Sequence, residues 1–282
     1  MSKFSPIIRA NNDGLALPEI GSWAERKYKL VGTYCDIFTN SMKNNWKNLV
    51  YIDLFSGAGY AKIKDTNKII MTSALIAMST PFKFNKYILC EMDKKKMDAL
   101  KFRALQHFPE LDISFIEGDT NQNVSEIQAI IHSISMTGST LCFAFVDPFS
   151  LNLHFSTIRA LSKFRMDFLI LLAIGMDFNR NLNLYLDDEN EKIVKFLDNK
   201  DWRKELEKNP DKQNVMQFLS LNYDKNMVDL GYVKPTDKHQ IRSDNKNLPL
   251  YHLAFYSKHK LGNEFWKKVQ KYGQNQQLNL FE

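Results

Sequence analysis

The chain has 282 residues, of which 44% are apolar and 25% charged, an ordinary composition for a globular protein with a sizeable core. It contains no run of about 18 uninterrupted apolar residues, and its start, Met-Ser-Lys-Phe-Ser-Pro, lacks the layout of a secretory signal. These features argue against a membrane protein and predict a soluble, cytoplasmic one. The net charge of +6 is compatible with RNA or DNA as a partner but does not establish one.

The first 22 residues are polar and rich in turn-forming residues, so we predict an N-terminal arm there. From Trp23 to Met42 apolar residues recur at the spacing of a helix. Short apolar runs then alternate with amphipathic stretches as far as residue 173. We predict strands at 49–55, 86–91, 112–116, 140–146 and 167–173, with helices at 71–79, 94–108, 124–135 and 154–164.

Two of the strand-like runs, 141–146 and 168–172, are apolar without interruption. Such strands fit a parallel sheet that helices cover on both faces. With helices between them, the strands fit right-handed βαβ connections. Residues 23–181 therefore predict an α/β fold with a doubly wound, mostly parallel, Rossmann-like sheet.

The alternation ends after Asp177. Residues 182–247 are rich in Asn, Asp and Lys, and their amphipathic stretches predict a helical insertion. These stretches are 189–198, 200–207 and 212–222. Residues 248–282 return to strand character at 251–256 and to a helix at 263–272, so we predict that they complete the sheet domain.

The three cysteines, Cys35, Cys90 and Cys142, stand far apart and form no CxxC pair. Two of them lie in apolar runs, where a free cysteine behaves as a small hydrophobic residue. We therefore predict buried free thiols, rather than metal ligands, and no bound metal.

Acidic residues stand at the ends of four consecutive predicted strands: Asp53, Glu91, Asp119 and Asp147. The carboxyl ends of parallel strands meet at one edge of the sheet, where ligands bind. The first strand runs into the turn 53–59, Asp-Leu-Phe-Ser-Gly-Ala-Gly, whose small residues let the backbone approach a ligand. One such acid is more often a helix cap or a surface charge, but four in order favour a ligand site.

The glycines narrow the class of ligand. The chain has no Gly-x-x-x-x-Gly-Lys-Ser/Thr motif, which argues against a P-loop. The three-glycine dinucleotide motif is incomplete, because Lys62 stands at its third glycine position. Glu91 is placed where a carboxylate can accept two hydrogen bonds from a ribose diol. The pattern therefore favours a nucleoside without a pyrophosphate.

These residues resemble the class I S-adenosylmethionine-dependent methyltransferases, and more narrowly the bacterial three-Cys-motif partner protein (TcmP) family. The resemblance covers roughly residues 20 to 270. Its matching stretches are Trp23 with Lys27, Tyr51–Gly59, Cys90–Asp93, Glu117–Asp119, Asp147–Phe149, Met176–Asn181 and Tyr251–Gly262. The narrower match rests on the last two.

The resemblance implies S-adenosyl-L-methionine as the cofactor. The turn 53–59 would face its methionine part, Glu91 its ribose hydroxyls and Asp119 its adenine amino group. The cofactor-binding residues that it implies are Asp53, Phe55, Ser56, Gly57, Gly59, Glu91, Asp119 and Thr120. It also implies a three-Cys-motif protein, encoded nearby, as a candidate partner.

The segment Asp147-Pro148-Phe149 resembles the Asp-Pro-Pro-Tyr/Phe signature of enzymes that methylate exocyclic amino groups of nucleobases. In those enzymes the acidic or amide side chain accepts hydrogen bonds from the amino group, and the aromatic ring stacks on an extruded base. This chain has one proline instead of two, and Ser150 follows the aromatic residue. The alternative is that Asp147 and Pro148 cap the next helix while Phe149 lies in the core. Both interpretations stay open, with these three residues as the catalytic candidates.

Four further residues are candidates for the substrate side. Asp177, Asn179 and Arg180 follow the fifth strand, and Lys258 follows the late strand, so we expect all four at the same sheet edge. Lys258 there would contact nucleic-acid phosphates. A buried turn and a surface loop are the alternatives.

Three functions are compatible with these observations. The first is a methyltransferase that modifies an amino nitrogen of a base in RNA or DNA. The second is a methyltransferase-like binding module that holds the cofactor, or has lost it, and serves a partner protein in a defence or mobile-element cassette, without transfer activity. The third is a small-molecule methyltransferase, for which no apolar lid is identifiable.

Overall fold

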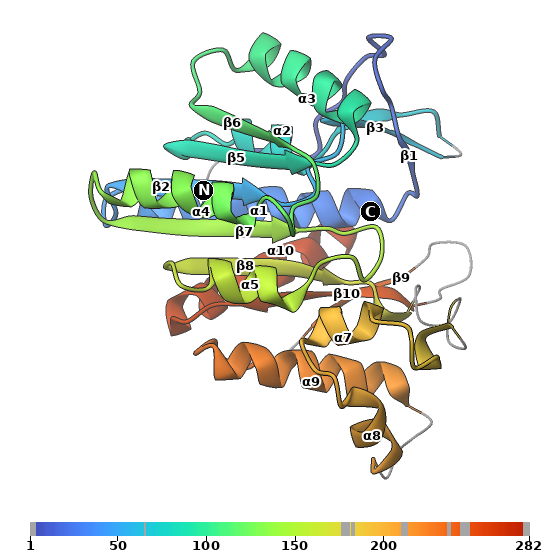
Figure 1. Ribbon diagram of the computed structural model, residues 1–282. Helices are drawn as coiled ribbons and strands as arrows, with labels where there is room; N and C mark the ends of the chain where they lie inside the picture. Colours follow the sequence, from blue (N-terminus) through green and yellow to red (C-terminus); the bar gives the residue numbers. More distant parts are fainter. Residues whose placement is uncertain are drawn as a thin grey trace.

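In the computed structural model the chain is described at residues 4–64, 66–175, 181, 184–209, 214–235, 238–242 and 249–278. Its centre is a seven-stranded sheet with helices on both faces (Figure 1). In spatial order the strands are β6 (Ile113–Glu117), β5 (Lys86–Glu91), β2 (Asn48–Asp53), β7 (Thr140–Val146), β8 (Met166–Leu172), β10 (Pro249–Tyr256) and β9 (His239–Arg242). The helices are α1 (Ala24–Met42), α2 (Ser73–Met78), α3 (Lys94–His107), α4 (Val124–Ser135), α5 (Phe155–Leu161), α7 (Lys192–Leu197), α8 (Trp202–Glu207), α9 (Val215–Asp229) and α10 (Lys260–Leu278).

Neighbouring strands of this sheet pair in parallel except at β10, which runs antiparallel to both β8 and β9. From β2 the chain moves outward through β5 to β6 and then returns to the other side of β2, where β7 and β8 follow. The strand order therefore reverses between β2 and β7. Open α/β sheets bind their ligands at such a switch point. The predicted doubly wound, mostly parallel fold is confirmed.

Alternation along β2 separates two hydrophobic cores, one on each face of the sheet. Leu49 and Tyr51 belong to the core built with α1, α2, α3 and α10, whereas Val50 and Ile52 belong to the core built with α4, α5, α7, α8 and α9. All six residues of β2 are buried. This burial on both faces is the physical reason for the uninterrupted apolar run in the sequence.

The region predicted as a helical insertion, 182–247, contains α7, α8 and α9, and it also contains β9, which the sequence analysis did not predict. Figure 1 shows these helices together beyond the side of the sheet formed by β8 and β10. Their buried residues Trp202 and Tyr223 belong to the same core as Phe168 of β8. The region therefore completes one face of the sheet.

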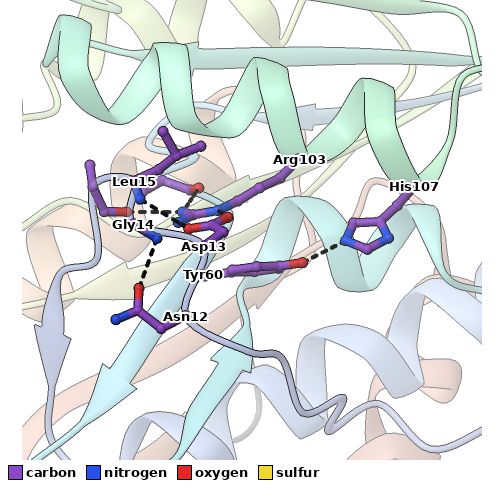
Figure 2. Close-up of polar contacts among 9 residues, drawn as sticks. Asn12, Asp13, Gly14, Leu15, Tyr60, Arg103 and His107 are labelled. Atoms are coloured by element: carbon purple, nitrogen blue, oxygen red, sulfur yellow. Dashed lines mark hydrogen bonds and ion pairs between the residues drawn. The ribbon is translucent and has the colours of Figure 1, made fainter.

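The predicted N-terminal arm takes part in a second, three-stranded sheet of β1 (Glu19–Ile20), β3 (Tyr60–Ile63) and β4 (Ile69–Met71). Arg103 of α3 is fully buried and binds both carboxylate oxygens of Asp13 in the arm, at 2.7 and 2.6 Å (Figure 2). The same guanidinium donates to the carbonyls of Ala16 in the arm and Ala58 in the turn after β2. Arg103 thus fixes the arm against that turn.

We expect Asp13→Ala to lower the free energy of unfolding by about 3 kcal/mol or more, because it leaves the buried Arg103 guanidinium without its carboxylate. Chemical denaturation measures this change. Asp98→Ala is the matched control, because it breaks an ion pair with Lys94 on α3 whose side chains are 55% and 70% exposed. The control should lose less than about 1 kcal/mol. Equal losses for the two variants would contradict this role of Arg103.

The three cysteines are buried and free, as predicted. Within the described ranges, no group of three or more His, Cys, Asp or Glu side chains could hold a metal ion. In the same part of the chain, no helix combines the length and the apolar character that crossing a membrane requires.

Candidate functional site

A cavity of about 930 Å³ lies at the carboxyl ends of β2, β5, β6 and β7, where the strand order reverses. Pro18 and Ile20 of the arm contribute to its wall, and Trp23 and Lys27 contribute from the start of α1. The predicted site residues that line it are Phe55, Ser56, Gly57, Glu91, Asp119, Thr120, Asp147, Pro148 and Phe149. Three of the four strand-end acids are therefore brought together, as expected.

Hydrogen bonds to neighbouring strand ends hold the turn after β2 in place. The Ser56 N–H donates to the Cys90 carbonyl at 2.8 Å, and the Thr120 hydroxyl donates to the Leu54 carbonyl at 2.7 Å. Gly57 has a φ of +65°, and a Cβ built on it meets no atom within 4 Å. Glycine adopts this left-handed conformation without strain. Because Gly57 lines the cavity, its missing side chain leaves open space beside the turn.

Asp53 and Gly59 do not line the cavity. They stabilise the turn after β2 through buried contacts. Asp53 is fully buried and accepts hydrogen bonds from the Tyr51 hydroxyl at 3.1 Å and the Phe55 N–H at 3.2 Å. A Cβ on Gly59 would lie 3.1 Å from the side chains of both Leu75 and Leu100, so glycine permits this close packing. A direct cofactor contact by either residue stays a prediction.

Burial raises the pKa of the Asp53 carboxyl to about 7. The unfolded chain titrates this carboxyl near pH 3.9, so between these values the folded protein binds a proton that the unfolded chain lacks. Stability conferred by the protonated form is therefore lost as the pH rises from about 4 to about 7. We expect Asp53→Asn to lack this part of the pH dependence in urea denaturation. A variant with the wild-type pH slope would contradict the assignment.

Glu91 ends β5 with a carboxylate that already orients the turn after β2. One oxygen accepts the Gly57 N–H and the other accepts the Asp93 N–H, each at 2.9 Å. An ionised carboxylate has about four acceptor positions, so each oxygen can take one more hydrogen bond. A vicinal diol is a ligand group that would use both oxygens at once.

The turn after β6 is tied to the loop after β7 through Asn121. The Asn121 side chain donates to the Asp119 carboxylate at 2.9 Å and to the Asn152 carbonyl at 3.0 Å, and it accepts the His154 N–H at 2.9 Å. Asp119 is thereby held at the cavity edge, one strand along from Glu91. The Asp119 carboxylate is thus a hydrogen-bond acceptor, suited to an amino group, in the same cavity as Glu91.

The loop after β7 places Asp147 in the cavity wall and Phe149 in solvent at the rim. The Asp147 side chain is 17% exposed and accepts a hydrogen bond from the Lys27 ammonium. Phe149 is 96% exposed. The next helix, α5, has His154 as its N-cap residue. The alternative that Asp147 caps this helix while Phe149 lies in the core is therefore wrong.

Lys258 lies at the opposite end of the strands from the cavity. The prediction that it lies beside the other candidates is therefore wrong. Because β10 is antiparallel to β8, its last residue Tyr256 pairs with Phe168 near the start of β8. The chain leaves β10 away from the cavity, and Lys258 donates to the Ser162 carbonyl at 2.6 Å. The sequence pattern predicts a late strand but does not give its direction, and the direction decides at which end of the sheet Lys258 lies.

The same reversal brings Tyr251, at the other end of β10, into the cavity wall. Only knowledge of the strand direction could have placed Tyr251 there. Asp177, Asn179 and Arg180 lie outside the described residues, so their substrate-side role stays a prediction.

Comparisons with solved structures found distant matches at low sequence identity. Trm1 from Pyrococcus horikoshii, solved with S-adenosyl-L-methionine, is 12% identical over 85% of this chain and 58% of its own, with a TM-score of 0.41. TYW2 from M. jannaschii, solved with AdoMet, is 11% identical over 91% of this chain and 87% of its own, with a TM-score of 0.40. A Legionella pneumophila protein of the DUF519 family is 14% identical over 55% of this chain and 72% of its own, with a TM-score of 0.38. Similarity this low identifies neither a family nor a function.

No protein-family model matches the sequence, and a search of the curated proteins found no match.

Proposed function

We propose that this chain is an S-adenosyl-L-methionine-dependent methyltransferase that acts on an exocyclic amino group of a base in RNA or DNA. The observation that carries the proposal is the set of residues that line one cavity at the switch point. Glu91 and Asp119 line it and fit a nucleoside, and Asp147 and Phe149 line it as a hydrogen-bond acceptor and an aromatic ring.

The cavity residues fit this cofactor part by part. Glu91 and Asp119 both line the cavity. In this proposal the Glu91 carboxylate accepts the two ribose hydroxyls, and Asp119 accepts the adenine amino group. Gly57, without a side chain, leaves open space for the methionine part. When bound, the cofactor would supply an electrophilic methyl group for transfer to nitrogen, with the electrons of the carbon–sulfur bond going to its sulfur.

Asp147 and Phe149 fit the amino group and the ring of an extruded base. The Asp147 carboxylate accepts a hydrogen bond from the amino group, which orients the nitrogen lone pair, and it can take the proton that nitrogen loses. The exposed ring of Phe149 offers a stacking face, and such stacking contributes about 1–3 kcal/mol per base. Lys96 and Lys192 at the cavity wall supply positive charge for backbone phosphates.

We expect Gly57→Ala to weaken cofactor binding at least about tenfold, because the added methyl group fills space beside the turn and strains a left-handed backbone. Gly231→Ala is the matched control. Gly231 has a φ of +87° and equally open surroundings, but it does not line the cavity. The two variants should lose similar stability in chemical denaturation, whereas only the first should lose affinity in calorimetry. Unchanged affinity in Gly57→Ala would contradict the place given to the methionine part.

The experiment that tests the proposal is transfer of labelled methyl from S-adenosyl-L-methionine to bulk RNA and bulk DNA, followed by mass spectrometry of the nucleosides. Nucleosides that carry a methyl group on an exocyclic nitrogen would support it. Methylation of a carbon or a ring nitrogen, or label only in small molecules, would overturn the substrate part. No transfer to any acceptor would overturn the proposal as a whole.

The second candidate is a TcmP-like module that binds the cofactor and serves a partner protein without transfer activity. The single proline after Asp147, where the signature has two, favours it. This candidate predicts cofactor binding in calorimetry with no transfer in the assay above. Transfer by the isolated chain would exclude it.

A further inference from the structure

Lys27 is a buried lysine at the start of α1 whose ammonium contacts the carboxylate of Asp147. Its side chain is 5% exposed. The ammonium lies 5.2 Å from the ring centre of Trp23 and 4.7 Å from that of Tyr28, within reach of both π faces. The two partners are 120 residues apart in the sequence, so the fold has to bring them together.

The charge on Lys27 is maintained by its surroundings. Burial alone lowers the pKa of this ammonium, but the Asp147 carboxylate, with Tyr28 and Asp53 nearby, more than offsets this and raises the pKa above its usual value. An uncompensated charge would be strongly disfavoured at this depth. Lys27 therefore donates its hydrogen bond to Asp147 as a charged ammonium.

The contact uses one oxygen of Asp147 and leaves the other without a partner among the described residues. Lys27 bonds to Oδ2, and no described residue donates to Oδ1. Because Asp147 lines the cavity, Oδ1 is the acceptor available to a ligand there. A carboxylate held by one oxygen loses its freedom to rotate, and this is the preorganisation that in-line transfer requires.

We propose that Lys27 is the positioning residue for Asp147: it holds one carboxylate oxygen so that the other meets the amino group to be methylated. This inference rests on the proposed function and assigns a role in it to a residue outside the signature. Lys27 acts through Asp147 and does not hold the cofactor. The competing possibilities are that it binds the cofactor's own carboxylate or that it serves only the stability of the fold.

The test compares Lys27→Met, Lys27→Arg and Asp147→Asn with the double variant Lys27→Met/Asp147→Asn. Misplacement of a catalytic group by about 1 Å lowers rates about 100-fold, and we expect a fall in kcat of that order for Lys27→Met. The KM for nucleic acid and the Kd for S-adenosyl-L-methionine should stay within about threefold of wild type, a change of less than 1 kcal/mol. Lys27→Arg, which keeps the charge but is larger, should retain more of the rate than Lys27→Met.

The double variant separates a role through Asp147 from a role of its own. If Lys27 acts only through Asp147, then Lys27→Met/Asp147→Asn should have the same kcat as Asp147→Asn alone, because effects within one unit are not additive. This comparison does not need Lys27→Met alone to fold, since the double variant leaves no buried charge unpaired and Asp147→Asn keeps an amide oxygen that can accept a hydrogen bond from the Lys27 ammonium. A further tenfold fall in the double variant would overturn the proposal.

Lys238→Met is the structural control. It removes a lysine whose side chain is 15% exposed and which pairs with Asp224 at 2.8 Å, away from the cavity. It should lower stability and leave kcat unchanged.

A Kd for the cofactor that rises tenfold or more in Lys27→Met would show that Lys27 binds the cofactor and would overturn the inference. An equal fall in kcat for Lys238→Met and Lys27→Met would show a purely structural role. A wild-type protein without transfer activity would defeat the proposed function itself, whereas an active wild type with a fully active Lys27→Met variant would defeat only this inference.

Discussion

Asp147→Ala is expected to lower the rate of methyl transfer by about 100- to 10,000-fold, the range associated with loss of a positioned acid–base group. The Kd for S-adenosyl-L-methionine should change by less than about threefold, because the proposed cofactor contacts lie at the carboxyl ends of β2, β5 and β6. Single-turnover transfer of labelled methyl, with calorimetry on the same preparation, measures both quantities.

Loss of fold has to be separated from loss of chemistry in this variant, because Asp147→Ala leaves the buried Lys27 ammonium unpaired. Breaking one side of a buried ion pair typically lowers stability by about 3–5 kcal/mol, whereas removing both sides is often close to neutral. Lys27→Met/Asp147→Ala should therefore recover stability but not activity. Asp198→Ala, which breaks a half-exposed pair with Arg159, should stay fully active. Lost cofactor binding or unchanged transfer in Asp147→Ala would rule out the catalytic role.

Glu91→Ala is expected to raise the Kd for S-adenosyl-L-methionine by about 100-fold. Each hydrogen bond to a charged group contributes about 1.5 kcal/mol at the lower end of its range, and two ribose hydroxyls give about 3 kcal/mol. The variant also frees the Gly57 N–H, so the turn after β2 loses one of its supports. Calorimetry measures the change.

Glu117→Ala is a matched control for this prediction. Glu117 ends β6 in direct register with Glu91, but its side chain pairs with Lys94 and does not line the cavity. Its removal should leave the Kd within about twofold of wild type. Similar changes in the two variants would show that Glu91 has no special part in binding.

The sequence contains strong signals for the parallel strands, because strands buried on both faces must be apolar throughout. The predicted 86–91 and 140–146 coincide with β5 and β7. Strand β9 escaped prediction because His-Gln-Ile-Arg has a single apolar residue, and β3 and β4 escaped because they are only four and three residues long. Strand β9 pairs with β10, and β3 pairs with β4. Strands this short depend on such partners for their stability, so local periodicity does not mark them.

The residues of the candidate site likewise fall into those that the sequence could predict and those that it could not. Strand-end acids such as Glu91 could be predicted because topology alone carries them to one edge. Asp53 shares that edge, but its depth below the turn depends on packing around Tyr51. Lys258 was misplaced because its position depends on the direction of β10, which residue types do not encode. The contact of Lys27 with Asp147 depends on tertiary structure and has no local signal.

Isothermal titration calorimetry of the wild-type protein with S-adenosyl-L-methionine tests the central claim most directly, since cofactor binding is the step on which every other proposal depends. We predict saturable binding at one site, which weakens about 100-fold in Glu91→Ala and is unchanged in Glu117→Ala. No binding heat at about 1 mM cofactor, the level of the weakest specific complexes, would contradict the assignment of this cavity.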